Sequence, residues 1–227
     1  GDPDAFTPNL DKLASQGIRF TNAISGAPVC SPFRATLMSG MYIHKHGVVG
    51  NNILLNPDFK TLGNLFEDAG YATGYIGKWH LDAPFQPYVD CANNKGEMAW
   101  NEWCPPERRH GFDFWYAYGT YDYHDRPMYW STDAERNDFH YVDQWGPEHE
   151  ADLAIKYIQN KDGEYRNSHK PFALVVSMNP PHMPYDRVPE KFKDLYKDAD
   201  TTKLLSRPDI PPAGTQWGEY YRKNIRN

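Results

Sequence analysis

Apolar residues recur at helical spacing in several segments of the chain, and polar or glycine-containing turns separate these segments. Leu10, Leu13 and Ala14 lie on one face of a predicted helix that begins after Thr7 and ends at Gly17. The same spacing predicts three further helices: Pro32–Ser39, Thr61–Ala69 and Glu148–Gln159.

Apolar runs between these helices predict strands at Ile18–Ala23, Tyr71–Ile76 and Phe172–Met178. The last run is continuously apolar, which is typical of a central strand buried on both faces. Helices that alternate with strands predict an α/β fold with a mostly parallel central sheet and helices on both faces. Residues 83–147 lack periodicity and are interpreted as long loops, with or without short strands, around a site. The polar, proline-rich residues after Tyr185 are expected at the surface.

The charge balance narrows the range of ligands. The 227 residues carry a formal net charge of −6, without a dense stripe of lysine and arginine, so nucleic acid is not an expected partner. No apolar run approaches the length of a membrane span. An acidic protein that handles an anionic substrate must concentrate its positive charge locally, so clustered cations are the feature to look for.

Three cysteines leave one without a partner if the other two pair. Cys91 and Cys104 lie in one loop-like region and would pair in an oxidising compartment, leaving Cys30 free and reactive. The alternative is a reduced protein with three unreactive thiols, and the composition fits both.

The sequence Cys30-Ser31-Pro32-Phe33-Arg34 combines a candidate nucleophile with an anion-binding position. Cys30 or Ser31 is expected at the cap of the predicted Pro32–Ser39 helix, where unpaired N–H groups and the helix dipole favour negative charge. Arg34 follows one turn later on the same face. Taken alone, the pattern also fits a buried cysteine before a helix that starts at proline.

A second group of candidates is Gly77-Lys78-Trp79-His80, which follows the strand predicted to end at Ile76. It therefore lies at the carboxyl edge of the sheet, where α/β folds bind ligands. If the chain stays extended, Lys78 and His80 point the same way and Trp79 points the opposite way. The pair would hold one anionic group, although a solvated lysine and a structural histidine are the simpler interpretation of either residue alone.

The third candidate is His182, within Asn179-Pro180-Pro181-His182-Met183-Pro184-Tyr185, directly after the strand predicted at Phe172–Met178. Flanking prolines stiffen the backbone, so the imidazole would be presented rigidly to protonate a leaving oxygen. A structural histidine in a turn is the alternative. The loops that carry Lys78, His80 and His182 are expected at one edge of a parallel sheet. This shared position favours one common site with Cys30 over unrelated structural roles for each residue.

These motifs resemble those of the formylglycine-dependent type I sulfatases of the alkaline phosphatase superfamily. The cysteine motif with Leu37-Met38-Ser39-Gly40 resembles the sulfatase signature, and the other two motifs follow in the family's order. The resemblance covers about Phe6 to Tyr185. Further stretches that are similar to this family are Thr7-Pro8-Asn9-Leu10-Asp11-Lys12-Leu13, Gly17-Ile18-Arg19-Phe20-Thr21-Asn22-Ala23 and His44-Lys45-His46-Gly47-Val48.

The resemblance implies an alkaline-phosphatase-like fold that is incomplete at both ends, so that residues 1–227 form a partial catalytic domain. The family's metal-binding aspartate pair would precede this chain, and its remaining metal ligands and a second active-site lysine would lie beyond Asn227. Two positions depart from the family pattern, with Phe33 where serine is usual and Met41 where many relatives have arginine. Conversion of the cysteine depends mainly on Cys30, Pro32 and Arg34, so we expect it to occur.

The resemblance also implies the chemistry. Cys30 would be converted to formylglycine by a formylglycine-generating or anaerobic sulfatase-maturating enzyme, and would ligate Ca²⁺, with Mg²⁺ as an alternative. Arg34 would hold the modified residue, Lys78 would bind the sulfate, His80 would take a proton, and His182 would bind near the leaving oxygen. The implied substrate is a sulfated carbohydrate or polysaccharide, and the implied location is periplasmic or secreted.

Other interpretations remain open from the residues. A phosphodiesterase or phosphonate monoester hydrolase would use the same nucleophile and metal, and a non-catalytic carbohydrate-binding relative would need neither. His44 and His46 have the spacing of a zinc pair on a strand, but the sulfatase-like segment that contains them accounts for them better. Asp122, His124 and Asp125 would contact substrate or lie in a solvated loop, and the sequence fits both.

Overall fold

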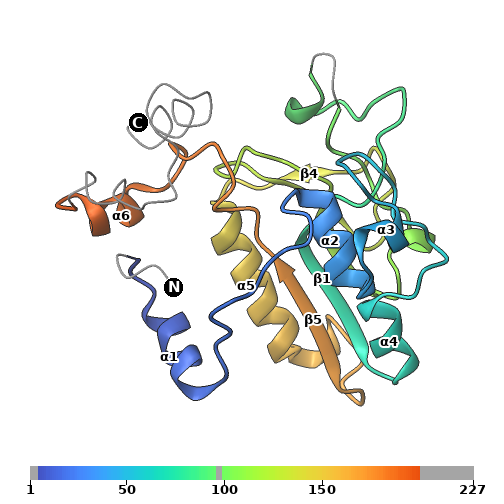
Figure 1. Cartoon of the computed structure of the whole chain (residues 1–227), viewed down its shortest axis with the longest axis horizontal. Coiled ribbons are helices and arrows are strands. Elements are labelled where there is room, and N and C mark those ends of the chain that lie inside the picture. Colours follow the sequence, from blue (N-terminus) through green and yellow to red (C-terminus); the bar gives the residue numbers. More distant parts are fainter. Residues whose placement is uncertain (1–4, 96–98, 200–227) are drawn as a thin grey trace. The chain divides into compact units, whose positions relative to one another are not determined.

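The computed structural model describes residues 5–95 and 99–199 (Figure 1). The chain forms two compact units, one from residues 1–25 with 188–227 and the other from residues 26–187. The larger unit contains the sheet and all the predicted catalytic side chains. The smaller unit contains, among its described residues, the helices α1 (Pro8–Gln16) and α6 (Glu190–Lys193).

The larger unit is built on a mixed five-stranded sheet with the order β4-β3-β2-β1-β5. Strand β1 runs parallel to its two neighbours, β2 and β5, whereas β3 and β4 are added antiparallel. This arrangement confirms the α/β fold, with a parallel core and an antiparallel extension. The strands are β1 (Ala72–Lys78), β2 (Phe114–Tyr118), β3 (Met128–Ser131), β4 (His140–Tyr141) and β5 (Phe172–Ser177).

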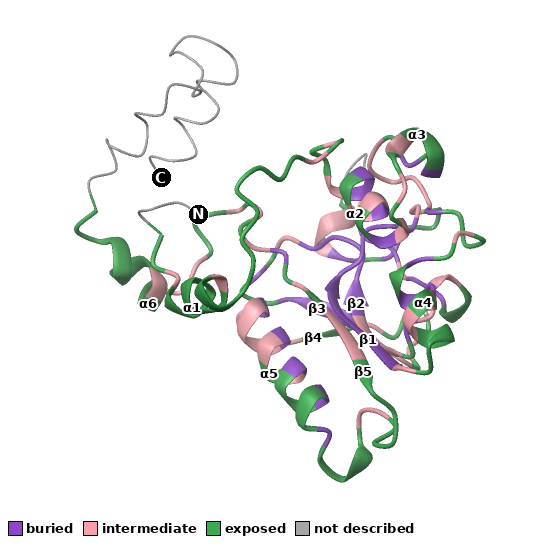
Figure 2. Cartoon of the chain, turned by 60° about the horizontal axis from the view of Figure 1, so that its bottom comes forward, coloured by how far each residue is buried: buried purple, intermediate pink, exposed green. Residues whose placement is uncertain are grey.

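Helices cover both faces of the sheet, as the sequence predicts (Figures 1 and 2). Tyr75 of β1 packs in a buried cluster with Met38 of α2, while the neighbouring Gly74 meets the ring of Tyr157 on α5. Successive residues of a strand face opposite sides, so α2 and α5 lie on opposite faces. The helices of this unit are α2 (Cys30–Ser39), α3 (Ile43–His46), α4 (Leu62–Asp68) and α5 (Gly146–Gln159).

Glycine at position 77 permits the close approach of β1 and β5 just before the catalytic segment. Gly77 has a φ of 99°, and a Cβ placed there would lie 2.3 Å from the carbonyl oxygen of Ser177. Only a residue without a side chain fits both the conformation and the space. Beyond this point, Trp79 packs into the core against Tyr75 and Trp115, which anchors the end of β1.

Two strand predictions are corrected. Ile18–Ala23 forms no strand in the structure, and Ile18 and Phe20 are 86% and 80% exposed. The segment has the residue preferences of a strand, but no neighbouring strand pairs with it among the described residues. The strand predicted at Phe172–Met178 is confirmed as β5 (Phe172–Ser177), but it is not buried on both faces as predicted. Among the described residues β5 pairs only with β1, and it is intermediate or exposed along its length.

The cysteine pairing and the helix cap are also corrected. Cys91 and Cys104 are both free and belong to different buried clusters, so no disulfide joins them. Helix α2 is capped by Val29 without a side-chain hydrogen bond, and it begins at Cys30. Ser31 does not cap it because its hydroxyl donates instead to the backbone carbonyl of His80, at 2.7 Å.

The described part of the chain contains no helix that combines the length and the apolar character needed to cross a membrane. The tail after Tyr185 includes α6, and residues 200–227 lie outside the described part.

Candidate active site

Cys30 is the first residue of α2 and is only partly buried. A hydrogen bond with the His182 side chain lowers the pKa of its thiol below the usual value, against the opposing effect of burial. The positive charges of Lys78 and Arg34 lower this pKa further. The site therefore stabilises negative charge on the atom at this position, as a nucleophile requires.

Arg34 ties α2 to the ends of two strands. Its Nη1 donates to the backbone carbonyl of Lys78 at 2.7 Å and to the hydroxyl of Ser177 at 2.8 Å. The Lys78 carbonyl also accepts from the Tyr75 hydroxyl at 2.6 Å. These bonds place the guanidinium charge beside Cys30 and fix the junction of α2, β1 and β5.

Lys78 is the last residue of β1, and only 1% of it is exposed. Its Nζ donates a hydrogen bond to the side-chain carbonyl of Asn179 at 3.0 Å. Burial lowers the pKa of Lys78 to about 8, and Arg34 adds to this shift while Cys30 and Asp122 oppose it. A buried ammonium with hydrogens to spare is well suited to bind an anion at this point.

His80 follows two residues later, 2% exposed, with a φ of 54° that turns the chain away from the extended course predicted for it. Neither ring nitrogen has a hydrogen-bond partner among the described residues. Burial lowers the pKa of His80 to about 3, and the charges of Lys78 and Arg34 lower it further. The imidazole is therefore neutral, and it carries buried polar atoms that a ligand would satisfy.

The protonation state of His182 is opposite to that of the neutral His80. Its Nδ1 lies 3.3 Å from Oδ1 of Asp122 and 2.8 Å from the backbone carbonyl of Met183. The hydrogen bond with Asp122, followed by that with Cys30, raises the pKa of His182 to about 9. This side chain is consequently an imidazolium at neutral pH, about one-third exposed.

Two further residues connect these groups: Asn179, without a role predicted from the sequence, and Asp122, predicted either to contact substrate or to lie in a solvated loop. Asn179 accepts from Lys78 and donates to Asp122 Oδ1 at 3.1 Å and to the Tyr121 carbonyl at 3.0 Å. Asp122 in turn contacts His182. The position of Asn179 directly before Pro-Pro-His was a usable signal for its role, whereas nothing near Asp122 in the sequence distinguishes it from Asp125.

Comparison with known proteins assigns this arrangement to a family. A family model described as Sulfatase matches residues 1–224. The chain belongs to the sulfatase family. It is similar to an endo-4-O-sulfatase of Bacteroides thetaiotaomicron, with 38% identity over 92% of this chain and 43% of the relative. It is also similar to a ulvan-active sulfatase of Formosa agariphila, with 33% identity over 93% of this chain and 37% of the relative.

Solved structures agree with this assignment and with the fold. A crystal structure from Bacteroides fragilis that carries the name sulfatase yidJ superposes with a TM-score of 0.90 and 56% identity, over 98% of this chain and 49% of that one. This sulfatase chain therefore spans less than half the length of each of these three relatives.

The remaining histidine and acid candidates of this sulfatase chain lie outside the immediate site. His46 is on a short helix instead of a strand, and its two ring nitrogens contact the Thr36 hydroxyl and the Val48 amide. His44 stacks on Tyr42, so the pair does not converge as zinc ligands would. His124 holds the backbone carbonyls of His182 and Met183, and Asp125 pairs with Arg187.

The residues of this sulfatase chain do not complete a calcium site. Among residues 5–95 and 99–199, no group of three or more histidine, cysteine or acidic side chains is placed to hold a metal ion. The carboxylate of Asp122, which contacts the His182 side chain, also accepts hydrogen bonds from Asn93 and Asn179. The interpretation of the side chains around Cys30 therefore rests on their own contacts and charges and not on a bound metal ion.

Proposed function

We propose that this sulfatase chain supplies the nucleophile and the main anion-binding side chains for hydrolysis of a sulfate ester on a carbohydrate. The observation that carries the proposal is the convergence of Lys78 and His182 on Cys30. The charges of Lys78 and His182 also act on the buried ring of His80. Lys78 ends β1, His80 comes two residues later and His182 follows β5, so the parallel pairing of the two strands supports a shared site.

The charges around Cys30 suit a sulfate ester. Arg34, Lys78 and protonated His182 surround a position where they already favour an anionic sulfur. The same field would stabilise an attacking oxygen and the sulfate oxygens. Loss of one such contact would raise the barrier by roughly 2.7–4 kcal/mol.

We propose that Cys30 acts after conversion to formylglycine. The hydrated aldehyde supplies one hydroxyl for attack on sulfur and a second whose deprotonation releases inorganic sulfate. Partial exposure of Cys30, with cations on several sides, fits both access by a maturation enzyme and stabilisation of the hydrate.

We assign one proton transfer to His80 and the other to His182. Neutral His80 has one ring nitrogen with a free lone pair and would accept a proton from the nucleophile, while protonated His182 would donate one to the leaving oxygen. Environments that push two titratable groups in opposite directions are typical of an acid and base pair. Lys78 would bind the sulfate, and Arg34 would fix the orientation of residue 30.

The relatives support a carbohydrate substrate. Their names describe an endo-4-O-sulfatase and a ulvan-active sulfatase. Dependence on Ca²⁺ and a periplasmic or secreted location remain predictions from the family resemblance. A disulfide between Cys91 and Cys104 would have supported an oxidising location, but both cysteines are free.

The experiment that tests the proposal compares ester classes. Protein co-produced with a formylglycine-generating enzyme is assayed on a panel of sulfated saccharides and on matched phosphate monoesters and diesters, with Cys30→Ala as the control. Sulfate release that disappears in the control supports the proposal. Preferential cleavage of the phosphate esters would indicate the phosphoesterase alternative instead.

A further inference from the structure

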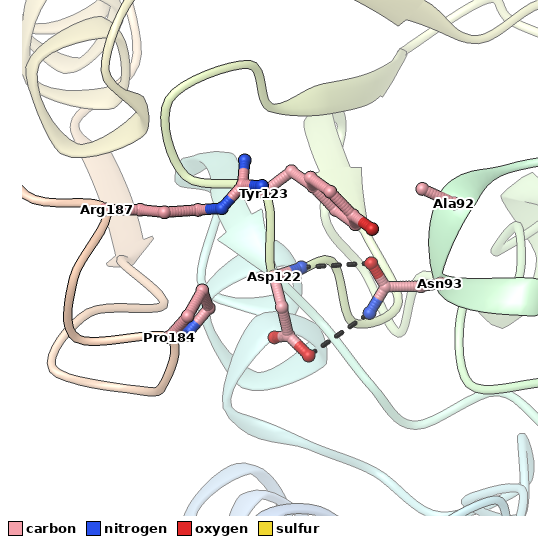
Figure 3. A pocket seen from close by; sticks show the side chains of 6 residues that line it. All are labelled: Ala92, Asn93, Asp122, Tyr123, Pro184 and Arg187. Atoms are coloured by element: carbon pink, nitrogen blue, oxygen red, sulfur yellow. Dashed lines mark hydrogen bonds between the residues drawn. The ribbon is translucent and has the colours of Figure 1, made fainter. Parts of the chain in front are cut away.

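A pocket of about 330 Å³ opens beside the candidate active site, within the size range of small-molecule sites (Figure 3). Asp122 connects the two, because it lines the pocket and contacts His182. Pro184, from the loop that carries His182, forms another part of the wall. The lining residues are Ala92, Asn93, Asp122, Tyr123, Pro184 and Arg187.

The polar groups of the pocket include both donors and acceptors. Asn93 accepts from the backbone N–H of Asp122 at 3.1 Å and donates to the Asp122 carboxylate at 3.2 Å. Its amide keeps one N–H and one lone pair without a partner among the described residues. The hydroxyl of Tyr123 also has no hydrogen-bond partner in the described part of the chain.

This mixture favours hydroxyl groups over a second anion. A hydroxyl both donates and accepts, whereas a carboxylate or sulfate group only accepts. The positive charge of the pocket is already balanced, since Arg187 Nη1 contacts both carboxylate oxygens of Asp125, at 2.9 and 3.1 Å. Asp122 would repel an added anion.

The pocket is also held in shape before any ligand binds. The Arg187 guanidinium lies 4.7 Å from the centre of the Tyr123 ring, which fixes one wall. On the opposite side Asn94, next to Asn93, donates to the carbonyls of Val89 and Asn101 at 3.0 and 2.8 Å. A rigid wall lowers the entropy lost on binding.

We propose that this pocket binds the sugar ring that carries the sulfate ester, in a form with free hydroxyls next to the ester. Neighbouring hydroxyls pair with Asn93 and Asp122, and the ring carbons lie against Tyr123. The inference rests on the proposed function, because it places the ester itself among Lys78, His80 and His182. It adds that the pocket selects a neutral, hydroxyl-bearing ring over a flat aryl group.

The test measures binding, so it does not depend on turnover. Affinities of the full chain for a panel of methyl hexopyranosides, their monosulfate esters and 4-nitrophenyl sulfate are measured by calorimetry and ligand-detected NMR. At least one sugar sulfate is expected to bind more tightly than 4-nitrophenyl sulfate. Tyr123→Ala and Asn93→Ala are expected to lower the ratio of these two affinities about tenfold each, which corresponds to about 1.4 kcal/mol.

Matched controls come from outside the pocket. Tyr42→Ala removes another exposed tyrosine, and Arg126→Ala removes an arginine that stacks on Tyr141 as Arg187 does on Tyr123. Neither should change the ratio, whereas Arg187→Ala, which removes the guanidinium that fixes Tyr123, should lower it. The inference is overturned if no sugar sulfate binds better than the aryl ester, or if the pocket variants leave the ratio unchanged. Failure of the proposed function is distinct, since it would appear as sulfate-ester binding that Lys78→Ala does not affect.

Discussion

The ammonium group of Lys78 donates a hydrogen bond to the side-chain carbonyl of Asn179 at 3.0 Å, and this bond joins the ends of β1 and β5. The two residues are 101 positions apart in sequence. Asn179 also donates to Asp122, which contacts His182, so one amide connects Lys78 to the candidate general acid.

Replacement of Asn179 by alanine should affect both stability and activity. The Asn179→Ala variant leaves the buried Lys78 ammonium without its acceptor, which costs about 1–3 kcal/mol of unfolding free energy. Urea denaturation measures this change. Asn137→Ala removes an exposed asparagine and should stay within about 0.5 kcal/mol of the unmodified protein. Equal stabilities of the two variants would contradict the assigned role of Asn179.

A side chain at position 77 should separate β1 from β5. In Gly77→Ala the new methyl group would meet the Ser177 carbonyl oxygen at 2.3 Å, in a backbone conformation that alanine rarely adopts. We expect a strongly destabilised or unfolded protein, measured by thermal denaturation. Gly50→Ala is the control, since its only neighbour within 4 Å is a side-chain carbon of Ile53 at 3.9 Å. Similar melting temperatures for both variants would refute this account of the strand packing.

Glu150 should make the stability depend on pH. It is buried against the hydroxyls of Tyr118 and Tyr129, and burial raises its pKa from 4.5 to about 8. The folded protein then binds more protons than the unfolded one between these values, so stability is greatest at low pH and falls as the pH rises through 8.

Glu150→Gln should remove that dependence and stabilise the protein above pH 8, by an amount on the order of a few kcal/mol. Unfolding free energies at pH 5 and pH 9 provide the measurement. Glu107→Gln, an exposed control, should retain the original pH dependence. An unchanged dependence in Glu150→Gln would show that this carboxyl does not titrate as described.

The three thiols should differ in accessibility. Before maturation, iodoacetamide applied to the native protein should label Cys30 and not Cys91 or Cys104, because only Cys30 is partly exposed. Cys91 and Cys104 are buried but free. Unfolding without a reductant should expose all three to labelling, as counted by mass spectrometry. Two thiols that resist labelling until a reductant is added would restore the disulfide prediction.

The residues that meet at the site could be predicted because they belong to local motifs at strand ends. Lys78 ends one strand and His182 follows another, both strands have clear apolar runs, and parallel strands bring their carboxyl ends together. The contribution of Asp122 could not be predicted in this way, because the path of a long loop depends on tertiary packing and not on periodicity.

One strand prediction fails and another is right in position but wrong in burial, for a related reason. Ile18–Ala23 and Phe172–Met178 both have strand-like composition, and the second forms β5. Residue preference does not specify which neighbours pair with a segment, so it predicts neither the missing partner of the first nor the edge position of the second. The positive φ of His80 was also unpredictable, since histidine seldom adopts that conformation without surrounding contacts that enforce it.

The central claim is that Cys30 becomes the formylglycine nucleophile of a sulfate-ester hydrolase. Peptide mass spectrometry across Cys30, on protein co-produced with a formylglycine-generating enzyme, tests it most directly. We predict that residue 30 loses its sulfur and gains an aldehyde that a hydrazide traps. An intact thiol at Cys30, in a preparation where a known sulfatase is converted, would contradict the claim.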